Sequence, residues 1–313
     1  MPMEKKIFVA CIFSLAAVLS ACATGERRPV RTADGMIVIP AGSFLMGFDS
    51  GMQNERPMHE VYLDSFSIDE KEVSAAEFAE FLNAKGNPGD LFFTADDHSA
   101  VIEEPSGNER PIYGQRRFAA RKGFENFPAN NVSWEGANAF CSWKGKRLPS
   151  EAEWEKAAKG EDLWLYPWGD ALPDSTKARY NGNWDDQGIA VMVPVDSLPS
   201  GVSPYGLLNM AGNVKEWVAD WYRQNYCDFC DPDGSDFNRT ASVLLGMEPP
   251  DVISRSRNPD VPPRSDTKGP AVGAFKVLRG GSWKEKSEPL RSSFREWLAP
   301  AERSSETGLR CAR

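Results

Sequence analysis

Residues 133–160, SWEGANAFCSWKGKRLPSEAEWEKAAKG, carry the strongest local signals for secondary structure in the chain. Each half predicts a helix, at 133–145 and at 150–160, and each of these segments ends at a glycine. In the second half, Ser150 and Glu153 have the spacing of a capping box. Helices with such clear boundaries anchor the interpretation of the less regular sequence around them.

A third helix is predicted at residues 74–86, SAAEFAEFLNAKG, where Ser74 and Glu77 form another capping box. Short apolar or alternating runs at 36–47 and 59–69 are broken by proline and glycine and predict strands of an irregular sheet. No second amphipathic block follows a linker, so we expect one α+β domain with little regular secondary structure. Such a domain needs disulfides or metal ions besides its core.

The amino terminus has the pattern of an exported chain. Two lysines precede an apolar run and a Leu-Ser-Ala-Cys step, so residues 1–21 are predicted to be a lipoprotein signal peptide and Cys22 the lipid-modified first residue. A transmembrane anchor is the alternative, but the run is well short of the ~20 residues that a span needs. Residues 22–35 are predicted to be a tether, and the domain then spans 36–313.

Ala23, in place of an aspartate after the cysteine, indicates the outer membrane among lipoproteins in general. We therefore expect a lipid-anchored protein of the bacterial cell envelope that faces the periplasm or the surface. The 313 residues carry a net charge of −9 without a basic stripe, which excludes nucleic-acid binding. Residues 223–269 show no periodicity and are predicted to form an irregular surface insertion.

Cys227 and Cys230 form a CDFC sequence at the start of this insertion. An oxidising compartment favours a local disulfide. A zinc or copper half-site and a redox pair remain open, because the spacing suits each of them.

Several blocks resemble the formylglycine-generating enzyme, or sulfatase-modifying factor, family. They are MIVIPAGSFLMG, NVSWEGANAFCSWKGKRLPSEAEWEKAA, YPWGD, YGLLNMAGNVKEWVADWY, VLRGGSW and GLRCA, in this order from about residue 36 to the end. The resemblance implies a single irregular domain related to C-type lectins. It also implies a disulfide between Cys141 and Cys311, for which two buried free thiols are the alternative. Closing a loop of that length would stabilise the fold by ~4–5 kcal/mol.

The family resemblance also implies a calcium site in NMAGNVKEW, with the side chains of Asn209 and Glu216 and the carbonyls of Gly212 and Val214 as ligands. Oxygen ligands around a turn suit this hard cation. An Asn–Glu turn without a metal is the alternative reading.

A second family calcium site maps most closely onto Asn181, the Gly182 carbonyl and Asp186, although Asn183 or Asp185 could replace them. Iron is not expected. A facial iron site needs two histidines and a carboxylate, and the chain's two histidines, His59 and His98, lie in unrelated contexts.

Copper is not expected either. In the copper enzymes of the family, two cysteines after GGS hold the metal, and here the count places Glu285 and Leu290 at those positions. Counting back from Arg295 gives serines, so no register supplies the thiolates that copper(I) needs. Lys215 also replaces a tryptophan that borders the family's substrate pocket.

A charged and aromatic loop remains, which we interpret as a recognition surface. Its candidate ligand-binding residues are Lys215, Ser282, Trp283, Glu285 and Arg295. An ordinary solvated loop is the alternative, and Arg295 could instead bridge an internal carboxylate.

Three functions are compatible with these residues. The favoured one is a calcium-stabilised family member without the copper site, a pseudoenzyme that binds an envelope protein or a small ligand. An enzyme of different chemistry, as in the pyoverdine-maturation branch, would use Glu285 or Glu288 as its acid or base. The third is an oxidase that converts sulfatase cysteine to formylglycine, which the missing thiolates disfavour.

Overall fold

The computed structural model describes residues 29–104, 116–183, 185, 188–224, 264–265 and 269–313. The predicted signal peptide, the predicted lipidation site Cys22 and the predicted ligand Asp186 lie outside these residues, as do Cys227, Cys230 and most of the predicted insertion. Within the described ranges, no helix is both long and apolar enough to cross a membrane.

The predicted helices are confirmed. The described chain contains α1 (Ala75–Lys85), α2 (Trp134–Trp143) and α3 (Glu151–Lys159). Each begins at a serine whose side chain accepts a hydrogen bond from a backbone N–H three residues on, and α1 and α3 have complete capping boxes. Glycines that adopt positive φ angles end α1 and α3, as the sequence indicates.

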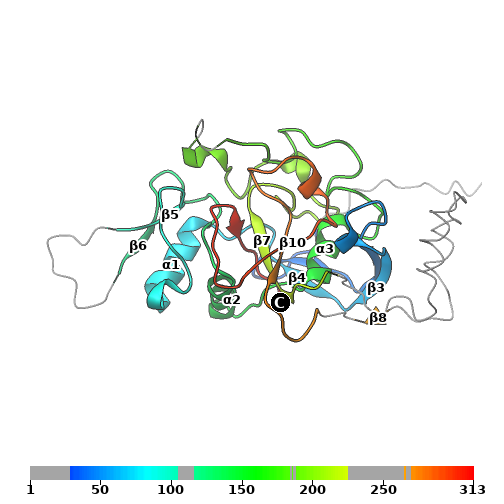
Figure 1. The fold of residues 1–313 in the computed structure, drawn as a ribbon, viewed down its shortest axis with the longest axis horizontal. Helices are drawn as coiled ribbons and strands as arrows, with labels where there is room; N and C mark the ends of the chain where they lie inside the picture. The colour runs from blue at the N-terminus through cyan, green and yellow to red at the C-terminus, as the bar shows by residue number, and fades with distance from the viewer. Residues whose placement is uncertain (1–28, 105–115, 184, 186–187, 225–263, 266–268) are drawn as a thin grey trace, which may run out of the picture.

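The strands are short and form four small sheets among the described residues (Figure 1). Two are strand pairs: β1 (Ile37–Ile39) with β4 (Phe66–Ile68), and β5 (Val101–Glu103) with β6 (Phe118–Ala120). A third contains β2 (Gly42–Met46), β3 (His59–Leu63) and β8 (Arg264–Ser265). The largest has the order β10-β9-β7-β11, from β7 (Lys215–Trp221), β9 (Lys276–Arg279), β10 (Glu296–Leu298) and β11 (Thr307–Gly308). The predicted strands at 36–47 and 59–69 are thus confirmed.

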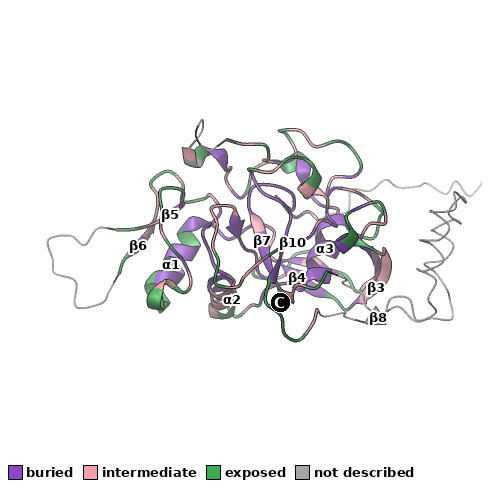
Figure 2. Ribbon diagram, in the orientation of Figure 1, coloured by how far each residue is buried: buried purple, intermediate pink, exposed green. Residues whose placement is uncertain are grey.

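Two apolar clusters form most of the core, and the central segments of Figure 2 are correspondingly buried. One gathers the phenylalanines of α1 and α2 with Phe93 and Phe118. The other packs β1 to β4 against Trp154 of α3. The four-stranded sheet contributes to both, since Trp217 lies in the first and Val218 in the second.

The carboxy-terminal residues close the domain. Cys311 forms the implied disulfide with Cys141 of α2; their Cα atoms are 5.5 Å apart, and their sequence separation is 170. Ala312 bridges both Ile68 and Arg147. The fold is therefore an α+β domain with little regular structure, and its last segment joins elements from three distant parts of the chain.

Candidate functional site

Lys215, the first residue of β7, lies among three carboxylates. Its Nζ is 2.6 Å from Glu285 Oε1, 2.8 Å from Glu296 Oε1 and 3.5 Å from Glu306 Oε2. All four side chains are largely but not fully buried. We call these four residues the Lys215 cluster.

The sheet and two backbone contacts assemble the Lys215 cluster. Glu296 begins β10, which is joined to β7 through β9, and the Lys215 N–H donates to the Glu306 carbonyl at 2.7 Å. Glu285 follows the Gly280–Gly281 turn, where both glycines have positive φ. A Cβ on Gly281 would lie 2.9 Å from the Pro289 carbonyl oxygen, so this turn requires glycine.

Ser282 and Lys284 tie the loop to the cluster. Ser282 donates from its backbone N–H to Glu285 Oε2 at 3.0 Å and from its hydroxyl to Glu306 Oε2 at 2.7 Å. Lys284 Nζ lies 3.4 Å from Glu306 Oε1 and is the most exposed member of this group. Of the predicted ligand-binding residues, the structure thus brings Lys215, Ser282 and Glu285 together.

The charges of the Lys215 cluster do not balance, because three carboxylates meet the two ammonium groups of Lys215 and Lys284. Burial raises the pKa of Glu296 to about 7, and the neighbouring Glu285 adds to this effect while Lys215 opposes it. Burial disfavours the Lys215 ammonium, but the charges of Glu296 and Glu285 outweigh it and raise the pKa of Lys215. The cluster therefore keeps its ammonium charged and holds a proton on a carboxylate near neutral pH.

Two residues of the predicted recognition surface lie in the interior instead. Trp283 is 4% exposed, donates from its backbone N–H to the Asn213 carbonyl and from its indole to the Ser305 carbonyl. Arg295 is also 4% exposed. The sequence placed both on a charged surface loop because their neighbours are charged, but strand pairing and the Gly280–Gly281 turn direct them inward.

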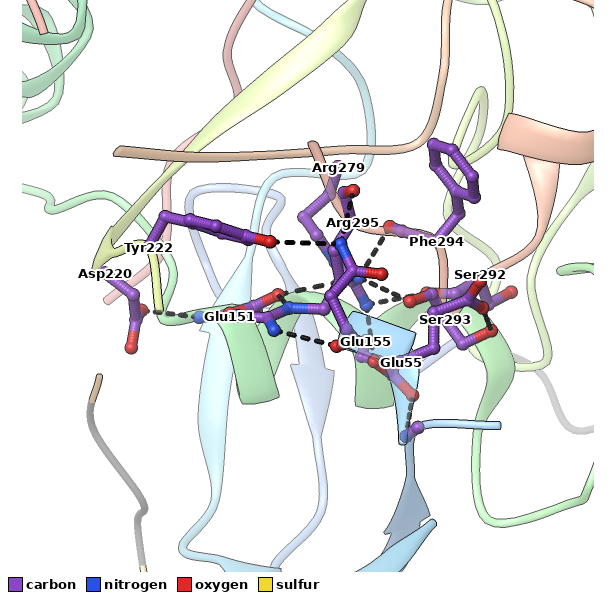
Figure 3. Close-up of polar contacts among 12 residues, drawn as sticks. Glu55, Glu151, Glu155, Asp220, Tyr222, Arg279, Ser292, Ser293, Phe294 and Arg295 are labelled. Atoms are coloured by element: carbon purple, nitrogen blue, oxygen red, sulfur yellow. Dashed lines mark hydrogen bonds and ion pairs between the residues drawn. The ribbon is translucent and has the colours of Figure 1, made fainter. Parts of the chain in front are cut away.

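Arg295 bridges an internal carboxylate, as the structural alternative expected (Figure 3). Its Nε and Nη2 donate to the two oxygens of Glu151 at 2.6 and 2.9 Å, and its Nη1 donates to the Asn54 carbonyl at 2.8 Å. The guanidinium also lies over the Tyr222 ring, whose stacking partner is Trp297. Through these contacts, Arg295 has a structural role between α3 and β10.

A second buried arginine, Arg279, fixes the same segment. It pairs with Glu155 and donates to the carbonyls of residues 292–294, which precede Arg295 (Figure 3). Beside this network, Asp220 accepts from the backbone N–H groups of Glu151 and Gly269, each at 2.7 Å. Burial, together with the charge of Glu151, raises the pKa of Asp220 to about 6.

The two predicted catalytic candidates differ in their surroundings. Glu285 is held by Lys215 and Ser282, as described above. Glu288 begins a short 3-10 helix, is mostly exposed and lies 3.5 Å from Arg291. Sequence reasoning did not single out Glu306, because nothing local in GLRC or its flanks indicates that the chain returns to β7.

The predicted calcium ligand Glu216 already has two partners. Both of its carboxylate oxygens accept from Arg310 at 2.7 Å, and Oε2 also accepts from Trp154 Nε1 at 2.8 Å. Oε1 therefore keeps a lone pair for a further partner. The amide nitrogen of Asn209 donates to Glu72 Oε2 and to the Val195 carbonyl, which leaves the amide oxygen as the atom that could bind a metal.

The donor set at this turn fits a hard cation, since it offers an amide oxygen, a carboxylate oxygen and backbone carbonyls. Glu72 and Glu216 are both buried, and the one guanidinium near them, that of Arg310, is bonded to Glu216. Burial, together with the charge of Glu216, raises the pKa of Glu72 to about 8. Among the described residues, no three His, Cys, Asp or Glu side chains group to hold a metal, so calcium here would depend on amide and backbone oxygens.

At the second predicted calcium site, Asn181 and Gly182 donate from their backbone N–H groups to the carbonyls of Glu285 and Trp283, at 2.7 and 2.6 Å. Their segment thus lies against the loop that carries Glu285. The third predicted ligand, Asp186, is outside the described residues.

The fold and this site define an irregular α+β domain in which a carboxy-terminal loop presents polar groups over a small sheet. The chain belongs to the FGE-sulfatase family, because residues 22–313 match the family's model, a sulfatase-modifying factor enzyme 1-like domain. The family resemblance and the fold class are thereby confirmed.

Individual relatives agree with this assignment. The formylglycine-generating enzyme of Streptomyces coelicolor is 33% identical over 334 residues, with 95% of each chain covered. The serine/threonine-protein kinase pkn1 of Chlamydia caviae is 32% identical over 289 residues, but the present chain spans 39% of that protein's length. Among solved structures, PvdO from Pseudomonas aeruginosa has a TM-score of 0.59 at 25% identity, covering 92% of this chain and 99% of that one.

Proposed function

We propose that this protein is a binding member of the family, anchored in the bacterial envelope by a lipid on Cys22, and that it lacks the copper oxidase chemistry of its relatives. One observation carries the proposal. In the loop where the resemblance would put the copper thiolates, Glu285 is bound to Lys215 and Leu290 is fully buried. A carboxylate held by an ammonium group and a buried leucine are poor ligands for copper(I).

The described cysteines support this view, because Cys141 and Cys311 are bonded to each other and offer no thiolate. The ligand we expect carries a cationic group and docks at the Lys215 cluster. A bound cation would offset the negative charge that a proton on Glu296 otherwise neutralises. Binding of the cation would therefore release that proton.

The oxidase question is tested by titrating the purified full chain with copper(I) without oxygen, then adding oxygen and a Cys-x-Pro-x-Arg peptide. We expect no tight copper binding and an unchanged peptide mass. Conversion of the cysteine to formylglycine would overturn the proposal and would require a copper site elsewhere in the chain.

The binding claim has its own test, with a lysine-rich peptide as the probe. Glu285→Gln combined with Glu306→Gln should weaken peptide binding about tenfold or more, because it removes two of the three carboxylates of the Lys215 cluster. Glu80→Gln, at an exposed glutamate of α1, is the matched control. Equal affinities for both variants would rule out the Lys215 cluster as the docking site.

Lipid attachment is checked by palmitate labelling, which Cys22→Ser should abolish.

Glu296 supports a second candidate, an enzyme of different chemistry. A carboxylic acid with a pKa near 7 is suited to transfer protons at neutral pH, and Glu296 is buried enough to reach that range. This candidate moves the acid or base from Glu285 or Glu288 to Glu296. A reaction whose rate falls strongly in Glu296→Gln but not in Glu288→Gln would favour it over simple binding.

A further inference from the structure

Glu72 is a fully enclosed carboxylate that none of the predicted sites included. It lies in the connection between β4 and α1, and only 2% of its surface is exposed. Its Oε2 accepts from the side-chain amides of Asn209 at 3.0 Å and Asn213 at 2.9 Å. Its Oε1 accepts from the Val214 N–H at 3.4 Å. One side chain thus contacts three residues of the turn at 209–214.

This turn has an unusual backbone that needs such support. Asn209 and Asn213 have φ angles of 53° and 63°, in the left-handed region that non-glycine residues seldom adopt. Gly212 also has positive φ, and a Cβ there would lie 2.3 Å from the Arg179 carbonyl oxygen. Hydrogen bonds from both asparagine amides to Glu72 hold the turn at its two ends.

The same hydrogen bonds fix which way each amide faces. With their nitrogens on Glu72, the amide oxygens of Asn209 and Asn213 face away from it. Asn213 Oδ1 accepts from the Val193 N–H at 3.0 Å, and Asn209 Oδ1 is left to serve as a ligand. Glu72 therefore orients the side chain of Asn209, and Asn209 supplies the ligand atom.

We propose that Glu72 is a positioning residue for a calcium ion at Asn209, Gly212, Val214 and Glu216. By accepting from the side-chain amides of Asn209 and Asn213, it keeps the Asn209 amide oxygen available to bind the ion. The proposal rests on calcium binding at this turn, which is itself an expectation carried by the family resemblance and the oxygen donor set. Groups that orient metal ligands in this way commonly contribute 10-fold to 100-fold in metal affinity.

The test compares Glu72→Gln with Glu70→Gln in the purified full chain. Glu70 lies two residues away, but its side chain pairs with Arg31 near the surface, and only its backbone carbonyl, which Glu70→Gln keeps, accepts from Leu208 and Arg310. Calcium is titrated calorimetrically at one fixed pH, and thermal unfolding is followed with calcium and with a chelator. We expect Glu72→Gln to weaken calcium binding about 10-fold to 100-fold and to reduce the calcium-dependent rise in Tm, whereas Glu70→Gln should leave both unchanged.

A purely structural role for Glu72 predicts something else. Glu72→Gln would then lower Tm equally with and without calcium and leave the Kd for calcium unaltered, and this result would overturn the proposal. Asn213→Gly provides a second variant if Glu72→Gln does not fold, because glycine tolerates the positive φ and removes one amide that Glu72 holds. It should weaken calcium binding in the same direction. A wild-type chain that binds no calcium would refute calcium at this turn altogether, whereas normal binding in both variants would refute only the role of Glu72.

Discussion

Replacing Arg295 with methionine tests whether the residue is structural, and the contacts of Arg295 set the expected cost. The substitution keeps an unbranched apolar chain but removes both hydrogen bonds to Glu151, which is fully buried. Leaving one member of a buried ion pair without its partner costs about 3–5 kcal/mol. Arg279 remains 3.6 Å from Glu151, so we expect the lower end, about 3 kcal/mol of the free energy of unfolding.

The assay is urea unfolding followed by tryptophan fluorescence, with Arg31→Met as the matched control. Arg31 pairs with Glu70 at the same 2.6 Å, but its side chain is 44% exposed, so its loss should cost under about 1 kcal/mol. Adding Glu151→Gln to Arg295→Met should recover part of the loss, because no buried charge then lacks a partner. If Arg295→Met costs no more than Arg31→Met, the assignment of Arg295 to the structural interior is wrong.

Two further predictions concern stability. Replacing Cys141 and Cys311 together with alanine should lower the free energy of unfolding by about 5 kcal/mol, from the entropy of a loop spanning 170 residues, and a loss below about 1 kcal/mol in urea unfolding would contradict this. The pKa of Asp220 is raised in the folded state to about 6, so the wild type should gain stability relative to Asp220→Asn as the pH falls from about 7 to about 4. A stability difference that stays constant over that range, in unfolding curves recorded at each pH, would show that Asp220 does not titrate there.

The parts of the fold that sequence predicted have short-range causes. Ser74 and Ser150 cap helices because their partners lie three residues away, so the motif is visible in a window of four residues. No short stretch of sequence contains both Cys141 and Cys311, so their disulfide was predicted through the family resemblance. The helices and this disulfide are thus confirmed, whereas the calcium sites, which the resemblance also implied, stay predictions.

The parts that were missed depend on distant partners. Glu72 and Asn213 are separated by 141 residues, and Arg295 and Glu151 by 144, so no spacing rule connects them. Trp283 looked like part of a charged surface because charges surround it in sequence, yet it is buried.

The contacts of Cys311 with Cys141 also have a consequence for the time course of biosynthesis. At about 5–20 residues per second, translation takes roughly 10–30 s to pass from Cys141 to its partner. Over that interval Cys141 lacks its partner, and the surface that the last segment covers is open to other chains. A chain that reaches an oxidising compartment before its last segment docks can therefore form mixed disulfides at Cys141.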